Sequence, residues 1–83
     1  KELLDIVNGL DVGLTASVWT RDLDTAMRLS DRIDAGYVWV NDSSDHYLGA
    51  PFGGVKQSGI GREECLGEML AYTETKTVTI VTT

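Results

Sequence analysis

The chain has 83 residues, of which 42% are hydrophobic and 24% are charged, and its formal net charge is −6. This length and composition predict one small globular domain with a thin core. The 13 acidic residues outnumber the 7 basic ones, which excludes the basic footprint that nucleic acids require and disfavours anionic membrane surfaces. The apolar runs are also too short to span a bilayer, so we expect neither nucleic acid nor membrane as a partner.

The sequence contains a single cysteine, Cys65. One cysteine forms neither an internal disulfide nor a metal cluster, and it fits a reducing compartment, so we expect a cytoplasmic protein. Acidic neighbours disfavour the thiolate that a nucleophile needs, and we interpret Cys65 as a small packing residue. Because the chain opens at Lys1 without an initiator methionine and enters a helical pattern at once, we expect it to be a piece of a longer protein.

The first predicted elements are a helix and a strand. Residues 2–8 show a helical pattern, and Asn8 followed by Gly9 is a typical helix stop. Residues 14–20 are rich in β-branched and aromatic side chains, which predicts a strand.

A second helix and a second strand follow. Asp22 is in position to cap a helix over residues 22–35, and Gly36 is in position to end it as a left-handed cap. The unbroken apolar run 37–40 predicts a strand that is covered on both faces. Strand, helix and strand in this order predict a crossover between parallel strands.

The second half begins with a long loop over residues 41–61, and loops of this length are usually functional. A helix over residues 62–73 is expected next, with Glu63 and Glu64 in its first turn. Residues 77–81 alternate between apolar side chains and threonine, which is typical of an edge strand that seeks a partner in its own sheet or in another subunit. The predicted fold is therefore α/β, with the order β-α-β-α-β and parallel strands.

The glycine-rich stretch PFGGVKQSGIGRE, residues 51–63, matches neither known phosphate-binding pattern. It lacks the spacing of a P-loop, and it contains only part of a dinucleotide fingerprint. Glycine also lets a backbone approach a surface that a side chain would block. We therefore interpret the stretch as a loop that passes close to another part of the protein.

Three ring-bearing residues of the long loop form a candidate pocket wall. His46, Tyr47 and Phe52 lie within seven positions, and together they would line one side of an apolar pocket. The alternative is that Phe52 plugs the domain's own core. Asp45 and His46 are adjacent, and no serine spacing suggests a catalytic triad.

Three blocks of the sequence resemble the aldehyde dehydrogenase superfamily. PFGGVKQSGIGRE resembles a C-terminal motif of that family, GLTASVWTRDLDTAMRLSDRIDAGYVWVN is similar to the segment before it, and AYTETKTVTIV is similar to the closing segment. The blocks agree in order and in gaps, and they cover nearly the whole chain.

The resemblance implies a fold and an activity for a longer parent protein. Family members are several times longer, have a dinucleotide-binding, a catalytic and an oligomerisation part, and oxidise aldehydes to carboxylic acids with NAD or NADP. Their nucleophilic cysteine, general-base glutamate and cofactor-binding segments lie upstream of the stretch seen here. The resemblance thus implies that residues 1–73 end the catalytic domain, that residues 74–83 form an oligomerisation strand, and that the chain contains no catalytic or cofactor-binding residue.

The resemblance also implies roles for individual positions. Phe52 matches an aromatic residue that lines the substrate tunnel, and residues 42–50, with Ser44 and His46, match the variable loop that shapes the tunnel's far wall. The backbone carbonyls of Lys56 and Gly59 match positions that hold potassium between subunits in some members that oxidise betaine aldehyde. The matching interface positions of the homo-oligomer, a dimer or a tetramer, are Glu74, Lys76, Val78 and Ile80.

Two readings of the function stay open at this point. In the first, the chain is the C-terminal part of an aldehyde dehydrogenase and is inactive alone. In the second, it is a stand-alone α/β interaction module that pairs through its last strand. The aldehyde, the choice of NAD or NADP and the oligomer size lie outside this sequence.

Overall fold

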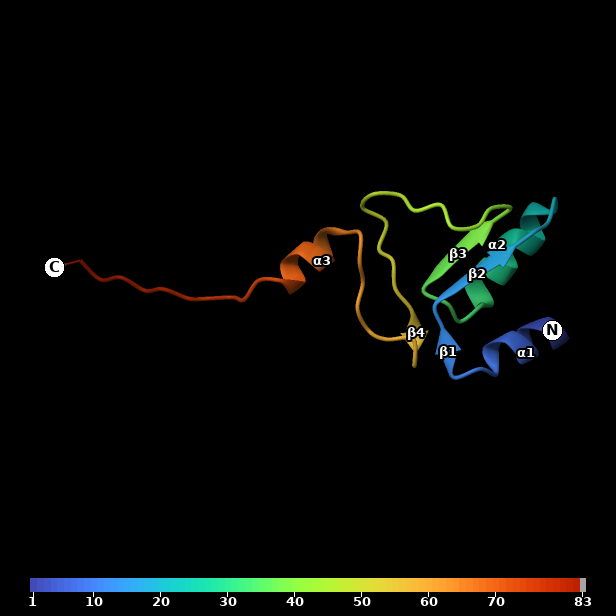
Figure 1. Cartoon of the computed structure of the whole chain (residues 1–83), viewed down its shortest axis with the longest axis horizontal. Helices are drawn as coiled ribbons and strands as arrows, with labels where there is room; N and C mark the ends of the chain where they lie inside the picture. The colour runs from blue at the N-terminus through green and yellow to red at the C-terminus, as the bar shows by residue number, and fades with distance from the viewer. Residues whose placement is uncertain (83) are drawn as a thin grey trace.

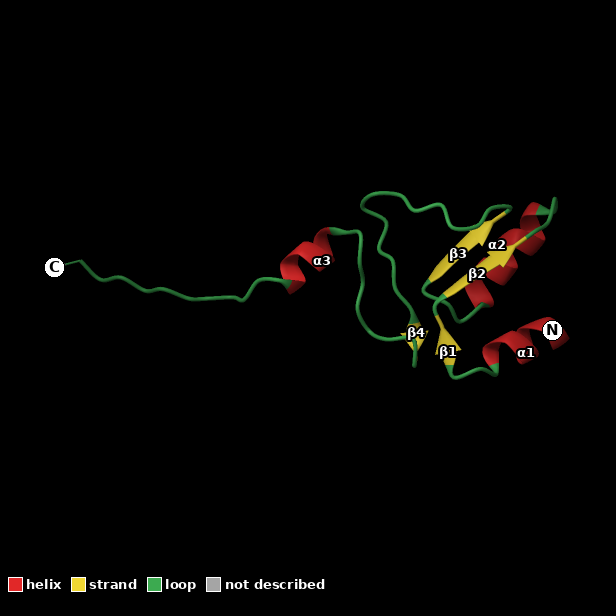
Figure 2. Ribbon diagram, viewed as in Figure 1, coloured by secondary structure: helices red, strands yellow, loops and turns green. Residues whose placement is uncertain are grey.

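Over residues 1–82, which the computed structural model describes, pairs of short strands separate the helices (Figures 1 and 2), so the chain is α/β as predicted but does not follow the predicted order β-α-β-α-β. In chain order the elements are α1 (Glu2–Asn8), β1 (Val12–Gly13), β2 (Thr15–Val18), α2 (Leu23–Arg32), β3 (Tyr37–Val40), β4 (Val55–Lys56) and α3 (Leu66–Ala71). No helix in this described part is long and apolar enough to cross a bilayer.

The β2–α2–β3 unit contains the core. β2 and β3 are parallel, with Thr15 opposite Tyr37 and Val18 opposite Val40, which confirms the predicted parallel pair. Helix α2 packs on this pair (Figure 1). The three buried hydrophobic residues of the described chain all come from this unit, and they are Val18, Ala26 and Trp39. β3 is covered only in part, because Val40 is 41% exposed.

The start of α2 agrees with the sequence, but its end does not. Asp22 is the N-cap, and its carboxylate accepts hydrogen bonds from the Asp24 amide at 3.2 Å and the Thr25 hydroxyl at 2.6 Å. These two bonds lower the pKa of Asp22, the hydroxyl being the larger cause. The helix ends at Arg32, and the next residue, Ile33, is extended with φ −73° and ψ 129°.

The prediction that Gly36 ends the helix as a left-handed cap is therefore wrong. Its amide donates to the carbonyls of Gly13 and Leu14, at 3.2 and 3.1 Å, so tertiary bonds replace helical ones. A Cβ at Gly36 would overlap the Gly53 carbonyl oxygen and come within 2.9 Å of Gly54 Cα. Gly36 is needed for close backbone packing, not for its φ angle.

The expected loop over residues 41–61 has structure of its own. β4 pairs with β1 in an antiparallel register, Val12 opposite Lys56, so the strands of the chain are not all parallel as predicted. Phe52 and Glu63 form a further bridge, in which the Phe52 amide donates to Glu63 at 2.9 Å and the Glu63 amide donates back at 2.6 Å. The glycine-rich stretch is thus closed into a loop by its own ends.

This bridge also corrects the predicted helix over residues 62–73. Because Glu63 is held extended against Phe52 and Glu64 is left-handed with φ 60°, the helix cannot begin at residue 62. Helix α3 begins only at Leu66, after the N-cap Cys65, and Glu68 is the acidic residue of its first turn.

The expected edge strand over residues 77–81 is not paired within the described chain. These residues form no strand, and Val78, Ile80 and Val81 are 69%, 79% and 81% exposed. The segment runs away from the rest of the molecule (Figure 1). The radius of gyration is accordingly 18.3 Å, against about 12 Å for a compact domain of this length. Thr83, the last residue of the predicted strand segment, lies outside the described residues.

Candidate functional site

Four rings from β3 and the long loop form an aromatic cluster, which consists of Tyr37, Trp39, His46 and Phe52. The two β3 residues share a face because side chains alternate along a strand, and their ring centroids lie 4.8 Å apart. His46 lies 4.7 Å from Phe52 and 5.7 Å from each β3 ring. The Trp39 indole N–H donates to the Asp45 carbonyl at 2.6 Å, which holds the loop against the strand.

The structure therefore brings together two of the three residues predicted to line a wall. His46 and Phe52 are in contact, whereas Tyr47 is 67% exposed and belongs to no ring pair of the cluster. Phe52 is half-buried and packs against Tyr37 and His46. Phe52 is thus only partly enclosed, although its cluster includes the buried core residue Trp39. A surface hollow of about 370 Å³ borders Phe52 on the side of the motif glycines and Arg62.

Glu64 is a member of the site that the sequence analysis missed. Its two carboxylate oxygens lie 2.9 and 2.8 Å from His46 Nδ1. The residues are 18 positions apart, and no motif spacing signals their pairing. Glu64 has a left-handed backbone, with φ 60°, a conformation that is uncommon for a residue other than glycine and that often occurs at functional sites.

Ser44, the third predicted substrate residue, lies outside the aromatic cluster. It is exposed and left-handed with φ 65°, and its hydroxyl is 3.5 Å from that of Ser43. In the same part of the loop, the carboxyl groups of Asp42 and Asp45 shift each other's pKa. A hydrogen bond between these two groups lowers the pKa of Asp42 and raises that of Asp45.

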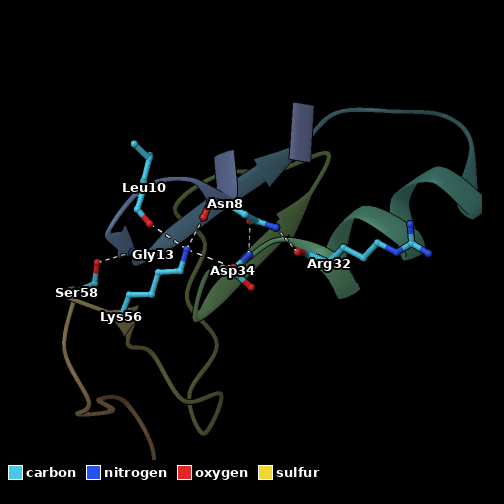
Figure 3. A network of polar contacts seen from close by, with 7 residues as sticks. All are labelled: Asn8, Leu10, Gly13, Arg32, Asp34, Lys56 and Ser58. Atoms are coloured by element: carbon cyan, nitrogen blue, oxygen red, sulfur yellow. Dashed lines mark hydrogen bonds and ion pairs between the residues drawn. The ribbon is translucent and has the colours of Figure 1, made fainter. Parts of the chain in front are cut away.

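Lys56, within the glycine-rich stretch 51–63, connects that stretch to the C-terminal ends of helices α1 and α2 (Figure 3). Its ammonium donates to the carbonyls of Asn8 and Leu10, at 2.8 and 3.0 Å, and lies 3.3 Å from the Asp34 carboxylate. The Asn8 side chain in turn donates to the Arg32 carbonyl at 2.7 Å and accepts from the Asp34 amide at 2.9 Å. We call this set of contacts the Lys56 clip.

The carbonyls of Lys56 and Gly59 belong to one tight turn. The Gly59 amide donates to the Lys56 carbonyl at 3.3 Å, and both residues are left-handed, with φ 54° and 116°. A potassium ion held by carbonyls needs several of them to replace its hydration shell, so these two fit such a site only as a contribution to ligands from elsewhere. Among residues 1–82, no group of three His, Cys, Asp or Glu side chains could hold a metal ion.

The predicted interface residues lie in the exposed C-terminal segment. Glu74 and Lys76 are exposed, as are Val78 and Ile80. The structure does not bring them near the aromatic cluster or the Lys56 clip.

Comparison with known proteins connects this arrangement to one family. The model of the aldehyde dehydrogenase family matches residues 1–78. The chain is 53% identical over 79 residues to the aldehyde dehydrogenase tropH of Talaromyces stipitatus, covering 95% of this chain and 15% of that protein. It is 50% identical over 82 residues to retinaldehyde dehydrogenase 3 of Rattus norvegicus, covering 96% of this chain and 16% of that protein.

Solved structures agree with the sequence comparison. An aldehyde dehydrogenase from Bacillus cereus, solved as its NAD+ complex, superposes with a TM-score of 0.83 at 43% identity, over 93% of this chain and 16% of that one. This chain spans only about a sixth of the length of these relatives. Since the family match extends over nearly all of its residues, the chain belongs to the aldehyde dehydrogenase family.

Proposed function

We propose that this chain is the C-terminal part of an aldehyde dehydrogenase that oxidises an aldehyde to a carboxylic acid with NAD+ or NADP+. In this proposal it supplies a wall of the substrate tunnel and a strand of the subunit interface, and it is inactive alone. The observation that carries the proposal is the aromatic cluster, in which the motif residue Phe52 lies 4.7 Å from His46 of the variable loop. We also propose a cytoplasmic location, on the single cysteine alone.

The residues of this chain would bind and orient the aldehyde but would not carry out its oxidation. In the parent reaction a cysteine thiolate attacks the aldehyde carbon, and a water molecule activated by a glutamate releases the acid. The nicotinamide cofactor, when bound, accepts the hydride. The half-buried rings of Phe52 and Tyr37 would exclude water and pack against the side chain of the aldehyde, with the buried Trp39 supporting them from behind. Cys65 is the N-cap of α3, and we assign it no chemical role.

The C-terminal segment supports the interface part of the proposal. Residues 74–82 expose their backbone groups and side chains, and exposed segments of this kind add as strands to the sheet of a partner. We propose that this partner is a second copy of the full-length protein, in a dimer or a tetramer. The carbonyls of Lys56 and Gly59 would contribute to a potassium site between the copies, with the remaining ligands supplied by the partner or by water.

The second candidate, a stand-alone interaction module, is favoured by the same exposed segment. In that case the gene would encode little more than these residues, and the pairing strand would be the whole function. The two candidates differ in the chemistry that they require of the complete gene product.

The test compares the 83-residue chain with the full-length protein that carries it, by the formation of NAD(P)H from aldehydes. We expect activity in the full-length protein only. In that protein, Phe52→Ala should raise the KM for the aldehyde about tenfold, which corresponds to about 1.4 kcal/mol of lost contact, and should leave the KM for NAD(P)+ unchanged. Activity in the isolated chain, or a loss of nucleotide binding in Phe52→Ala, would contradict the proposal.

A further inference from the structure

The backbone of Glu64 is held by hydrogen bonds on both sides, at its amide and at its carbonyl. The Glu64 amide donates to the Glu68 carboxylate at 2.8 Å, and its carbonyl accepts from the Gly49 amide at 2.9 Å. These bonds keep Glu64 in its left-handed conformation, with φ 60°. A strained backbone that is held from two sides indicates that the direction of this side chain matters.

Glu64 fixes the tautomer of His46. A carboxylate can only accept hydrogen bonds, so His46 Nδ1, at 2.8 and 2.9 Å from its oxygens, must carry the proton. In the neutral ring, Nε2 is then left as a hydrogen-bond acceptor. Among residues 1–82, no hydrogen bond involves Nε2, and the His46 side chain is 34% exposed.

The imidazole that carries this acceptor lies among aromatic rings. His46 is stacked on Tyr37 with an interplanar angle of 22°, and it makes tilted contacts with Trp39 and Phe52. Rings of this kind favour another ring at offset or edge-to-face geometry. The site thus offers contacts for an aromatic group and one polar atom that lacks a donor.

We propose that the His46–Glu64 pair selects aldehydes whose aromatic ring carries a hydroxyl group. The hydroxyl would donate to His46 Nε2, while the substrate's ring packs against the half-buried rings of Phe52 and Tyr37. In this proposal Glu64 is a positioning residue, because it acts only through the tautomer of His46. The inference rests on the proposed function, since it names the substrate class of the same candidate site.

The test measures kcat/KM of the full-length protein for matched aldehydes, namely phenylacetaldehyde and its ring-hydroxylated and ring-methoxylated forms. We expect a preference of about tenfold or more for a hydroxylated form over the unsubstituted one, as one hydrogen bond allows. The methoxylated forms, which can accept but not donate, should be no better than the unsubstituted aldehyde.

Two variants isolate the pair, and the readout is the ratio of the two kcat/KM values. His46→Phe keeps a ring but removes the acceptor, and Glu64→Ala removes the group that accepts from Nδ1, so that either nitrogen of the neutral ring can carry the proton. Both should reduce the preference to less than about threefold, whereas a merely structural defect would lower both kcat/KM values together. The matched control is Glu63→Ala, at an exposed neighbouring acid, which should keep the wild-type ratio.

The outcomes separate this inference from the proposed function. Equal use of the matched aldehydes by the wild type, a preference that survives in His46→Phe, or a preference for aldehydes with a carboxylate group would each overturn the inference and leave the dehydrogenase assignment standing. If the full-length protein oxidised no aldehyde at all, the proposed function would fail, and the inference would fail with it.

Discussion

The packing of Gly36 against the glycine-rich motif leads to a specific prediction for Gly36→Ala. A Cβ at this position would overlap the Gly53 carbonyl oxygen and come within 2.9 Å of Gly54 Cα. Because both neighbours are backbone atoms of a buried segment, they cannot yield as the end of a flexible side chain would. We expect the free energy of unfolding to fall by about 3 kcal/mol, at the upper end of the usual cost of overpacking.

The assay is urea unfolding of the protein that carries this chain, followed by tryptophan fluorescence. Because the slope for a protein of this size exceeds the roughly 1–3 kcal/mol per molar urea of small proteins, the midpoint should fall by up to about 1 M. Gly61→Ala is the matched control, because a Cβ there would meet no atom within 4 Å and the backbone does not have a positive φ. It should change stability by less than about 0.5 kcal/mol.

A third variant tests the reason for the glycine. A left-handed helix cap tolerates asparagine nearly as well as glycine, whereas a site limited by space does not. Gly36→Asn should therefore be as damaging as Gly36→Ala. If Gly36→Asn were close to wild type in stability, or if Gly61→Ala were as costly as Gly36→Ala, the close-packing explanation would be refuted.

Three further predictions concern the Lys56 clip, the cap of α2 and the C-terminal segment. Lys56→Met should lower the unfolding free energy by about 1–2 kcal/mol through the loss of two charge-assisted bonds, while Lys76→Met, at an exposed position, should have no measurable effect; equal urea midpoints would contradict this. Asp22 has a lowered pKa in the folded state, so its stability advantage over Asp22→Asn should be full above about pH 4 and should disappear as the pH falls through the folded-state pKa; an advantage that grew in acid would reverse the assignment. Ile80→Asp should shift the full-length protein toward monomer in sedimentation velocity, whereas Thr79→Asp, on the other side of the predicted strand, should do so less.

The sequence was sufficient for those elements whose causes are local. The strands β2 and β3 and the Asp22 cap were predicted correctly, because strand patterns and capping side chains act within a few residues, and the parallel pairing followed from the strand–helix–strand order. The end of α2 was not predicted correctly, because the amide of Asp34 donates to Asn8 and the amide of Gly36 donates to the β1–β2 segment. Propensity cannot register a competing partner more than twenty residues away.

The site shows the same division. The motif and the loop before it identified His46 and Phe52, but the pairing of His46 with Glu64 depends on a bridge between Phe52 and Glu63 that bends the chain back. That bridge also delayed the start of α3. Only long-range geometry could reveal the acid that pairs with the histidine.

The distribution of glycines explains how the motif can hold Phe52 without enclosing it. The Lys56 clip fixes the glycine-rich stretch at Lys56, and the backbone bridge to Glu63 fixes it at Phe52. Between them the buried glycines Gly53 and Gly54 pack through their backbones, so no side chain is needed to anchor this part of the loop. Because the position of Phe52 is set by the backbone on both sides, its ring does not need to be buried to be fixed, and it stays half-exposed beside His46. A wall that must meet a substrate requires such an arrangement, in which the contacting ring is rigid but its surface is not yet occupied.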